Sequence, residues 1–361
     1  MKILTYHTYH SSGVGGVETL FRTLKSYFGN HGLEVNEIYH DVLGEQLYHS
    51  KSGRETKLFG ASLGDGLIGK IIRKLSIYIY FAISPMECNT VIILTHPYNL
   101  NFIPKRIKKR AKIVLVQINK IDVYLESKNE NALLKNLRFV DKVVCYTDKD
   151  ARCLENKVNN DALSNKVEVI PRGCKLKKSN ARIFTNKKRL VTIARIEEKQ
   201  KNFQAMVEIF KKLPKEYTLD IYGAGEPEEI LQLESLINGV ERVIFQGPTN
   251  NVADVLNDYD LFIMTSRYEG FGQTLIEARS QGMPLVLFNT FEAASWIVNH
   301  NENGYLVEEN NILSFVNVIR SICEEKSVYE KFSSKAIEMA DMTDINKVNK
   351  KWLKLINSLV D

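Results

Sequence analysis

Short apolar runs alternate with longer stretches of mixed polarity along the whole chain. Each run has the length and the continuous apolar character of a strand that is buried in a parallel sheet. The stretches between the runs are long enough for helices, and strands separated by helices predict parallel sheets. The expected strands of the first half are 2–6, 34–39, 90–95, 113–117, 142–146 and 167–170. Those of the second half are 189–194, 218–222, 243–246, 261–265, 284–288 and 304–307.

The series is interrupted by a polar and basic segment at residues 176–188, which we interpret as a linker. It separates a predicted first domain, residues 1–175, from a predicted second domain, residues 189–344. A chain of 361 residues has the length of two domains of ordinary size. The last segment, residues 345–361, contains an amphipathic stretch that predicts a helix, with Trp352 among its apolar positions.

The clearest unit of strand, helix and strand lies at residues 260–288. An apolar run ends at Thr265, a helix is predicted from near Gln273 to just before Gly282, and the next run follows Pro284. The connecting loop reads Glu-Gly-Phe-Gly and begins with Glu269, whereas Glu277 falls in the early turns of the helix. Both carboxylates are thus expected near the carboxyl end of a strand, where open α/β sheets bind their ligands.

This loop is chemically suited to a diphosphate that is flanked by sugars. A helix N-terminus offers unpaired N–H groups to an anion, and Gly270 and Gly272 let the backbone approach it closely. We expect the amides near Thr274 and Leu275 to bind phosphate. A carboxylate accepts hydrogen bonds from a pair of sugar hydroxyls.

A second set of charged residues follows the first strand of the second domain. Arg195 offers a planar fork for phosphate oxygens, and a lysine in the next few residues offers a point charge. Two lysines compete for this role, Lys199 and Lys201; we favour Lys201 because Lys-Asn-Phe enters the following helix. Both cations would lie at the carboxyl end of their strand, over the same crevice as Glu269.

Two glycine turns follow other strands, and neither has the spacing of a dinucleotide-binding loop. Gly223 and Gly225 are followed by Glu228 where a third glycine would be needed, which excludes a dehydrogenase of that type. Near the N-terminus, Gly15 and Gly16 precede a predicted helix, so the backbone can approach a ligand closely at the helix N-terminus.

The string from Glu269 to Glu277, followed by Gly-x-Pro-Leu-Val, resembles the E-x7-E signature of retaining glycosyltransferases of family 4. The resemblance extends over nearly the whole chain and is most specific at residues 190–308. It implies the α/β GT-B architecture, in which two Rossmann-like domains with parallel sheets face each other across a cleft and the C-terminal helix joins the first domain.

The resemblance also implies a role for each residue of the site. Arg195 and Lys201 would neutralise the leaving diphosphate, together with the amides near Thr274 and Leu275 and the loop at Gly15 and Gly16. The donor sugar would be held by Glu269, Gly270, Phe271 and Gly272, and the ribose by Glu277. Pro248 and Thr249 lie in a turn that borders the nucleotide base in relatives. The catalytic residues would then be Glu269, Arg195 and Lys201.

The acceptor side is less defined by the sequence. His96 matches a common histidine of the family, although a packed structural histidine is an equal alternative. Many relatives carry another histidine after the next strand, where this chain has Gln117 and Asn119, and either amide is a candidate replacement. No cofactor is expected besides the nucleotide-sugar co-substrate, and no metal, because no D-x-D-like site accompanies the crevice.

Composition and charge limit the cellular setting. Five scattered cysteines without a C-x-x-C pair indicate neither a disulfide framework nor a zinc site and favour a reducing cytoplasm. Residues 1–180 carry 28 Lys and Arg against 17 Asp and Glu, whereas the remainder carries 21 against 26. The basic cluster at 105–112 and the basic, then apolar segment at 70–83 suit either a peripheral contact with an anionic membrane or ordinary packed and solvated helices. No nucleic-acid motif accompanies the charge.

The expected activity is therefore transfer of a sugar, most often UDP-linked in this family, to a glycan or lipid-linked glycan in surface polysaccharide biosynthesis. Three alternatives remain at this stage. The chain could be a GT-B enzyme of the nucleotide-sugar epimerase type, an inactive glycan- or nucleotide-binding protein, or a peripheral membrane scaffold.

Overall fold

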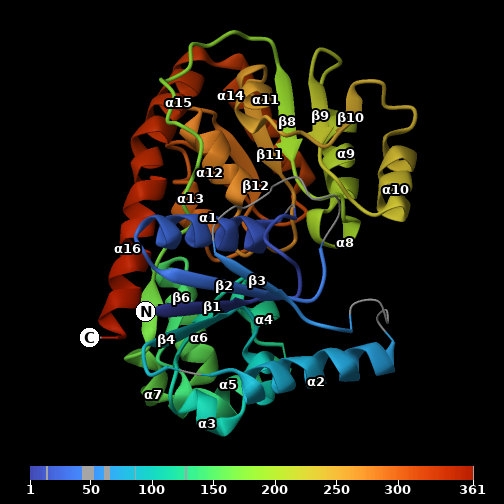
Figure 1. Cartoon of the computed structure of the whole chain (residues 1–361). Coiled ribbons are helices and arrows are strands. Elements are labelled where there is room, and N and C mark those ends of the chain that lie inside the picture. The colour runs from blue at the N-terminus through green and yellow to red at the C-terminus, as the bar shows by residue number, and fades with distance from the viewer. Residues whose placement is uncertain (14, 43–52, 61–65, 86, 127, 361) are drawn as a thin grey trace. The chain divides into compact units, whose positions relative to one another are not determined.

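A computed structural model of the chain describes residues 1–13, 15–42, 53–60, 66–85, 87–126 and 128–360. The chain divides into two compact units. The first consists of residues 1–171 together with 346–361, and the second of residues 172–345. Each unit contains one wholly parallel sheet with its own helices and its own core (Figure 1).

The sheet of the first unit has seven strands in the order β3-β2-β1-β4-β5-β6-β7. The strands are β1 (Lys2–Tyr6), β2 (Glu34–Tyr39), β3 (Arg54–Lys57), β4 (Thr90–Leu94), β5 (Lys112–Val116), β6 (Lys142–Cys145) and β7 (Val167–Val169). Apolar periodicity predicted all of them except β3. This edge strand, Arg-Glu-Thr-Lys, has exposed charged side chains and therefore lacks an apolar pattern, as is common at sheet edges.

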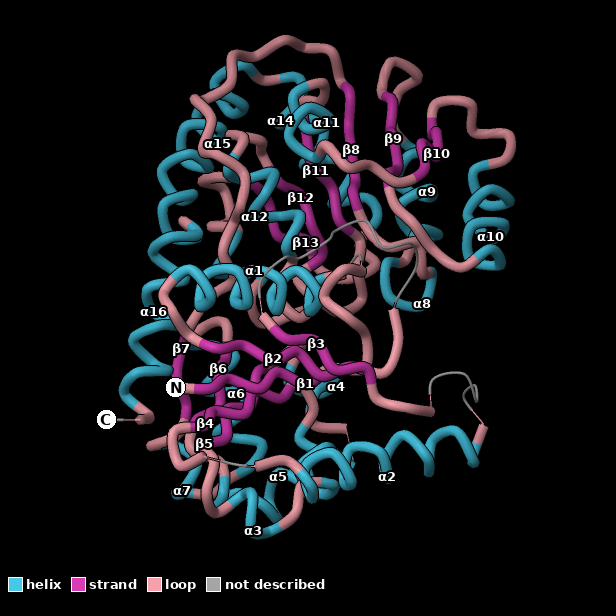
Figure 2. The backbone as a smooth tube through the Cα atoms, in the orientation of Figure 1, coloured by secondary structure: helices cyan, strands magenta, loops and turns pink. Residues whose placement is uncertain are grey.

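Helices cover both faces of the first sheet, as Figure 2 shows for α1 and α5 on opposite sides. They are α1 (Gly16–Asn30), α2 (Leu67–Ile83), α3 (Lys105–Lys108), α4 (Ile121–Tyr124), α5 (Lys128–Asn136), α6 (Asp148–Val158), α7 (Asp161–Ser164) and the 3-10 turns η2 (Pro97–Phe102) and η3 (Leu137–Phe139). The core on one face joins Ile92 and Leu115 of the central strands to Phe81 of α2 and Leu133 of α5.

The sheet of the second unit has the strand order β10-β9-β8-β11-β12-β13. Its strands are β8 (Arg189–Ile193), β9 (Thr218–Tyr222), β10 (Val243–Gly247), β11 (Leu261–Met264), β12 (Leu285–Phe288) and β13 (Gly304–Val307). All six were predicted, with boundaries that shift by at most one residue. The order reverses between β8 and β11, as it does between β1 and β4 in the first sheet.

The helices of the second unit include one long amphipathic pair that builds its core. Phe203, Met206 and Phe210 of α9 pack with Phe315 and Ile319 of α14. The helices are α8 (Glu198–Lys201), α9 (Phe203–Lys212), α10 (Pro227–Ile237), α11 (Val252–Asn257), α12 (Gln273–Ser280), α13 (Ala294–Ile297), α14 (Ile312–Glu324), α15 (Lys326–Ala340) and the 3-10 turn η4 (Asp341–Thr343).

Residues 176–188, the expected linker, pack along the second unit by specific hydrogen bonds. The Ser179 amide donates to the Ser280 carbonyl at 2.9 Å. The Arg182 guanidinium donates to the carbonyls of Gln281, Tyr259 and Leu256 at 2.8, 2.5 and 2.7 Å. A single arginine thus satisfies three carbonyl groups and holds this segment against its unit.

The last helix, α16 (Ile345–Ser358), belongs to the first unit from Asn346 onward. Its buried side chains are Val348, Asn349, Trp352, Leu355 and Ile356. Trp352 is 1% exposed and is the largest fully buried side chain of the described residues. The chain therefore leaves the first unit after Pro171 and returns to it for its final helix.

Candidate functional site

The loops that follow β8 and β11 lie side by side at the point where the strand order of the second sheet reverses. β8 pairs with β11 in parallel, with Leu190 opposite Leu261. Their carboxyl ends therefore share one edge of the sheet, and both loops open above it. This is the topological switch point at which open α/β sheets bind ligands.

The loop after β11 begins α12 with a backbone that requires glycine. Gly272 has a φ of 92°, and a Cβ at this residue would lie 2.7 Å from Cδ1 of Leu275. Gly272 caps α12 without a side-chain hydrogen bond to the helix amides. The Leu275 amide donates to the Gly272 carbonyl at 3.1 Å. Leu275 and Phe271 are buried, whereas Gln273 and Thr274 are partly exposed at the helix start.

Charged and amide side chains from the two loops form one network. Nζ of Lys201 lies 2.5 Å from Oε1 of Glu269, and both side chains are about nine-tenths buried. Nε2 of Gln200 donates to the Tyr268 carbonyl at 3.1 Å and to Oε2 of Glu269 at 3.5 Å. Oε1 of Gln200 accepts from Nη2 of Arg195 at 2.9 Å. The expected pair of cations thus lies with Glu269 in one cluster.

The geometry distinguishes the two lysines that competed in the sequence. α8 ends at Lys201, and Asn202 follows in the left-handed conformation with φ 56°. Oγ1 of Thr265, at the end of β11, donates to the carbonyls of Lys201 and Asn202 at 3.0 Å each. This corner turns Lys201 toward Glu269, whereas Lys199 is exposed.

The position of Arg195 depends on the glycine turn after β9. A Cβ on Gly223 would lie 1.8 Å from the Ala194 carbonyl oxygen, and one on Gly225 would lie 2.4 Å from the Ile196 oxygen. The amides of Ala194 and Ile196 donate to the carbonyls of Tyr222 and Ala224 at 2.9 and 2.8 Å. The two glycines therefore let two backbone segments touch on either side of Arg195.

Glu277 lies on α12, one turn from the loop, with an unusual proton affinity. Nε2 of Gln273 donates to its Oε1 at 3.3 Å and to the Gly173 carbonyl at 3.1 Å. Burial raises the pKa of Glu277 to about 7, and the Gln273 hydrogen bond and the charges of Arg172 and Lys175 oppose this rise. The group is thus close to half-protonated at neutral pH. Gln273 could have been found from its i, i+4 spacing to Glu277.

Pro248 and Thr249, the expected neighbours of the base, follow the edge strand β10. Gly247 has a φ of 76°, and its carbonyl accepts from the Gly223 amide at 2.9 Å. Pro248 is exposed, and Oγ1 of Thr249 accepts from the Asn251 amide at 3.1 Å. A backbone hydrogen bond thus connects this turn to the Gly223 turn. Among the described residues, no side-chain contact connects Pro248 or Thr249 to Glu269.

The first unit has a polar cluster of its own where its strand order reverses. Oγ1 of Thr95 lies 3.0 Å from Nδ1 of His7 and 3.1 Å from Nδ1 of His96. Nε2 of His7 lies 3.4 Å from Oε1 of Glu18. Burial, and secondarily the neighbouring His7, lower the pKa of His96 to about 4, so its ring is neutral at pH 7. The sequence singled out His96 but not its partner His7, which follows the first strand without any local motif.

The glycine loop before α1 encloses Glu18. Gly15 has an extended backbone, and a Cβ there would lie 2.1 Å from Oε2 of Glu18. Gly16 begins the helix. The Arg22 guanidinium donates to the carbonyls of Ser11 and Gly13 at 2.5 and 3.2 Å and so ties the loop to α1.

Gln117 and Asn119, the two candidate amides of the acceptor side, differ in burial and in their hydrogen bonds. Gln117 is fully buried, and its Nε2 donates to Oδ1 of Asp150 at 2.6 Å and to the Asn119 carbonyl at 3.0 Å. Its Oε1 accepts from the Tyr146 amide at 3.3 Å. The side chain thus joins β5 to the start of α6. Asn119 is half-buried, and its Oδ1 accepts from the Lys120 amide at 2.9 Å.

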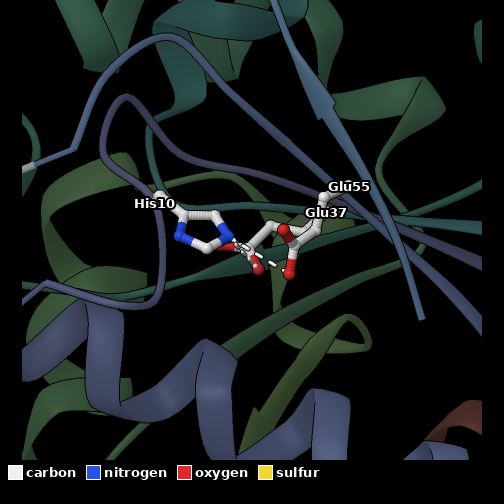
Figure 3. A group of neighbouring side chains, drawn as sticks. All are labelled: His10, Glu37 and Glu55. Carbon is white, nitrogen blue, oxygen red and sulfur yellow. Dashed lines mark ion pairs between the residues drawn. The ribbon is translucent and has the colours of Figure 1, made fainter. Parts of the chain in front are cut away.

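Figure 3 shows a further group, His10, Glu37 and Glu55, whose ligand atoms lie within 4.8 Å of one another. Nε2 of His10 is 3.4 Å from a carboxylate oxygen of each glutamate. The buried ammonium of Lys25 pairs with both glutamates, at 3.2 Å from Glu37. The ammonium lies against both carboxylates, and Ser11 donates from its amide and its hydroxyl to Glu37, so these side chains form an ion-pair and hydrogen-bond network.

Residues 175–339 match the sequence profile of the family described as "Glycosyl transferases group 1". This segment contains the network of Arg195, Lys201 and Glu269, as well as Glu277. The match covers most of the second unit, which is therefore similar to the domains of that family.

Solved structures show that the GT-B fold expected from the sequence is correct. The chain superposes on Staphylococcus aureus TarM, in complex with fondaparinux, alpha-GlcNAc-glycerol and UDP, with a TM-score of 0.79 at 16% identity over 99% of both chains. For Anabaena HepE in complex with UDP and glucose, the TM-score is 0.78 at 17% identity over 99% of this chain and 100% of that one.

Curated proteins that are similar to this chain are named glycosyltransferases. An uncharacterised glycosyltransferase of Haemophilus influenzae is 26% identical over 59% of this chain and 60% of its own length. The poly(glycerol-phosphate) alpha-glucosyltransferase of Bacillus subtilis is 31% identical over 42% of this chain and 23% of its own. A diphospho-undecaprenol 4-alpha-N-acetylgalactosaminyltransferase of Campylobacter jejuni is 22% identical over 73% of this chain and 75% of its own. The chain thus spans no more than 60% of the first two.

Proposed function

We propose that this protein is a retaining glycosyltransferase that moves a sugar from a UDP-sugar to a glycan or lipid-linked glycan in surface polysaccharide biosynthesis. The observation that carries the proposal is the cluster of Arg195, Lys201 and Glu269 beside the start of α12, in the unit that is similar to group 1 glycosyltransferase domains. UDP in the TarM and HepE structures supports the donor class, and the named relatives support the acceptor class.

In the proposed reaction, the bond between the anomeric carbon and the phosphate oxygen breaks while a bond to the acceptor oxygen forms on the same face. Arg195 and Lys201 stabilise the negative charge that develops on the leaving diphosphate, which is the main catalytic effect. A phosphate oxygen takes the proton of the acceptor hydroxyl. Because two side-chain cations supply the positive charge, we propose that no metal is required.

The ion pair of Lys201 and Glu269 suggests a defined change for each residue when the donor binds. A phosphate oxygen competes with Glu269 for the ammonium of Lys201, and the freed carboxylate accepts hydrogen bonds from the donor-sugar hydroxyls. On binding, the cations would therefore pair with the diphosphate, and the carboxylate of Glu269 would pair with sugar hydroxyls. Glu277, when ionised, accepts from the ribose hydroxyls.

The test is a thermal-shift and calorimetry series with UDP, GDP, ADP, NAD and their sugar conjugates, on the wild type and Glu277→Ala. A ligand at about a hundred times its Kd should stabilise the folded protein by roughly 2.7 kcal/mol. We expect UDP and its sugars to stabilise the wild type and not the variant. Stabilisation by none of them, or by NAD alone, would refute the assignment of this site.

Analysis of the reaction products distinguishes a glycosyltransferase from an enzyme that only cleaves the nucleotide sugar. With a glycan acceptor mixture, a transferase forms a glycosylated product that retains the donor's anomeric configuration, which NMR determines. An enzyme of the epimerase type releases UDP without a glycosylated product. Addition of EDTA should leave the initial rate unchanged.

A further inference from the structure

Helix α2 presents a stripe of large apolar side chains to solvent. The exposed members are Leu67, Ile68, Ile71, Leu75, Tyr78, Ile79 and Ile83. The side chains at the two ends, Leu67 and Ile83, are 76% and 77% exposed. Because they recur three and four residues apart, they follow one side of the helix for about 25 Å. An apolar patch of this extent on a folded unit marks an interaction surface.

The opposite side of α2 packs against the core of the first unit, so the helix already buries one apolar side and the exposed stripe is a second one. Ile77 and Phe81 are buried in the core of the first unit. The hydroxyl of Tyr80 accepts from Nδ2 of Asn36 at 3.0 Å. In Figure 2, much of α2 extends beyond its neighbours α3 and α5. The helix is thus anchored along one side and open along the other.

The charged side chains of α2 and α3 all have one sign. α2 contains Lys70, Arg73 and Lys74 and no acidic residue. The Arg106 guanidinium of α3 donates to the Ala82 carbonyl, which places α3 beside the end of α2. α3 and the two residues after it contribute four exposed cations: Lys105, Arg106, Lys109 and Arg110. A protein partner's surface usually mixes both signs, whereas an anionic lipid surface attracts cations alone.

We propose that the exposed side of α2, together with the exposed cations of α3, is a docking surface for a bilayer that contains anionic lipids. The helix would lie in the plane of the interface, with its apolar stripe among the acyl chains and its cations at the phosphates. Long basic side chains reach the headgroups while their stems stay apolar. No helix in the described part of the chain is long and apolar enough to cross a membrane.

This surface does not depend on the proposed activity, and its test uses binding alone. The full-length protein is floated with vesicles of phosphatidylcholine, or of phosphatidylcholine with phosphatidylglycerol. We expect binding to the anionic vesicles, and at least about a tenfold loss of the bound fraction for Ile71→Glu with Leu75→Glu. The matched control, Leu231→Glu with Leu313→Glu, changes two apolar residues of the second unit that are somewhat more exposed than Ile71 and Leu75, and it should bind as the wild type does.

A second pair of variants tests the charges. Lys105→Glu with Lys109→Glu should lower binding to the anionic vesicles by about tenfold or more and weaken its dependence on salt. Lys211→Glu with Lys212→Glu makes the same charge change on α9 and should have no such effect. Circular dichroism and the Tm verify the fold, and the charge variants still test the proposal if the α2 variant misfolds.

Three results would overturn the proposal. The first is that the wild type does not bind anionic vesicles. The second is equal binding by the wild type and the variants of α2 and α3. The third is a dimer of the wild type that dissociates in the α2 variant while vesicle binding is absent, which would make a second copy of the chain the partner.

Discussion

The proton affinity of Glu277 predicts that nucleotide binding depends on pH. Ribose hydroxyls donate to the ionised carboxylate, whereas burial raises the pKa of the free group to about 7. Affinity for UDP should therefore fall as pH decreases below about 7, by at most about tenfold per pH unit, and level off above it. Calorimetry between about pH 5.5 and 8.5 measures this. Glu277→Gln should bind weakly with a flat profile, and a flat wild-type profile would contradict the prediction.

Glu277 should affect stability and UDP affinity with opposite dependence on pH, because its protonation stabilises the folded protein but weakens ribose binding. The folded state holds the Glu277 proton more tightly than the unfolded chain, so its contribution to the free energy of unfolding grows as pH falls from about 7 toward the ordinary glutamate value. Without ligand, Glu277→Gln should have a higher Tm than the wild type near pH 8. The difference should shrink near pH 5, and thermal unfolding at the two pH values decides.

The pair of Lys201 and Glu269 predicts a coupled loss. Lys201→Met leaves a largely buried carboxylate without its cation and should lower the free energy of unfolding by about 2 kcal/mol. Lys201→Met with Glu269→Gln should recover most of this stability but not the transfer activity. Denaturant unfolding and initial rates form the double-mutant cycle. Lys199→Met, at an exposed neighbour, is the control; additive stability losses would exclude the coupling.

At the scale of single residues, charge, glycine spacing and the family resemblance predicted Arg195, Glu269 and Glu277 as site residues, and the structure joins Arg195 and Glu269 in one network through Gln200. Gln200 joins Arg195 to Glu269, but a neutral amide carries no pattern that separates a structural bridge from a surface residue. His7 was missed for a similar reason, since its contact with Thr95 depends on the pairing of β1 with β4. Contacts between distant segments become visible only when strand order is known.

At the scale of elements, the turn after β9 packs against the backbone next to Arg195, so a substitution in this turn should change the position of Arg195. Gly223→Ala places a methyl group within 1.8 Å of the Ala194 carbonyl oxygen and must displace one of the two segments. We expect a stability loss of about 1–3 kcal/mol and a weaker affinity for UDP. Gly66→Ala, where a Cβ meets open space, is the control. Unchanged UDP affinity in Gly223→Ala would show that this turn does not position Arg195.

The apolar strands could be predicted because burial on both faces of a parallel sheet demands continuous apolar runs. β3 could not, because an edge strand exposes its side chains and keeps only its backbone pairing with β2. The polar run at 176–188 was interpreted by composition alone. Its contacts through Ser179 and Arg182 reach residues about one hundred positions away, which composition does not encode.

At the scale of the whole molecule, the division into two units predicts that a substitution can lower the stability of one unit without changing ligand binding by the other. Trp352→Ala removes the largest buried side chain of α16 and should destabilise the first unit by about 3–5 kcal/mol. UDP affinity at a temperature where the protein stays folded should be unchanged, because the charged side chains proposed to bind the donor, Arg195, Lys201, Glu269 and Glu277, all belong to the second unit. Calorimetric unfolding and UDP titration measure the two effects. Lys354→Ala, exposed on the same helix, should change neither.

The return of the chain to its first unit at Asn346 also has a consequence for synthesis on the ribosome. Residues 172–345 form a continuous stretch of chain, so the second unit contains all of its own residues whether or not α16 has joined the first unit. The first unit, although its sheet is translated earliest, lacks the side chains of Trp352 and Ile356 until α16 has been made. Chains truncated before α16 should therefore expose the core of the first unit to proteases and chaperones.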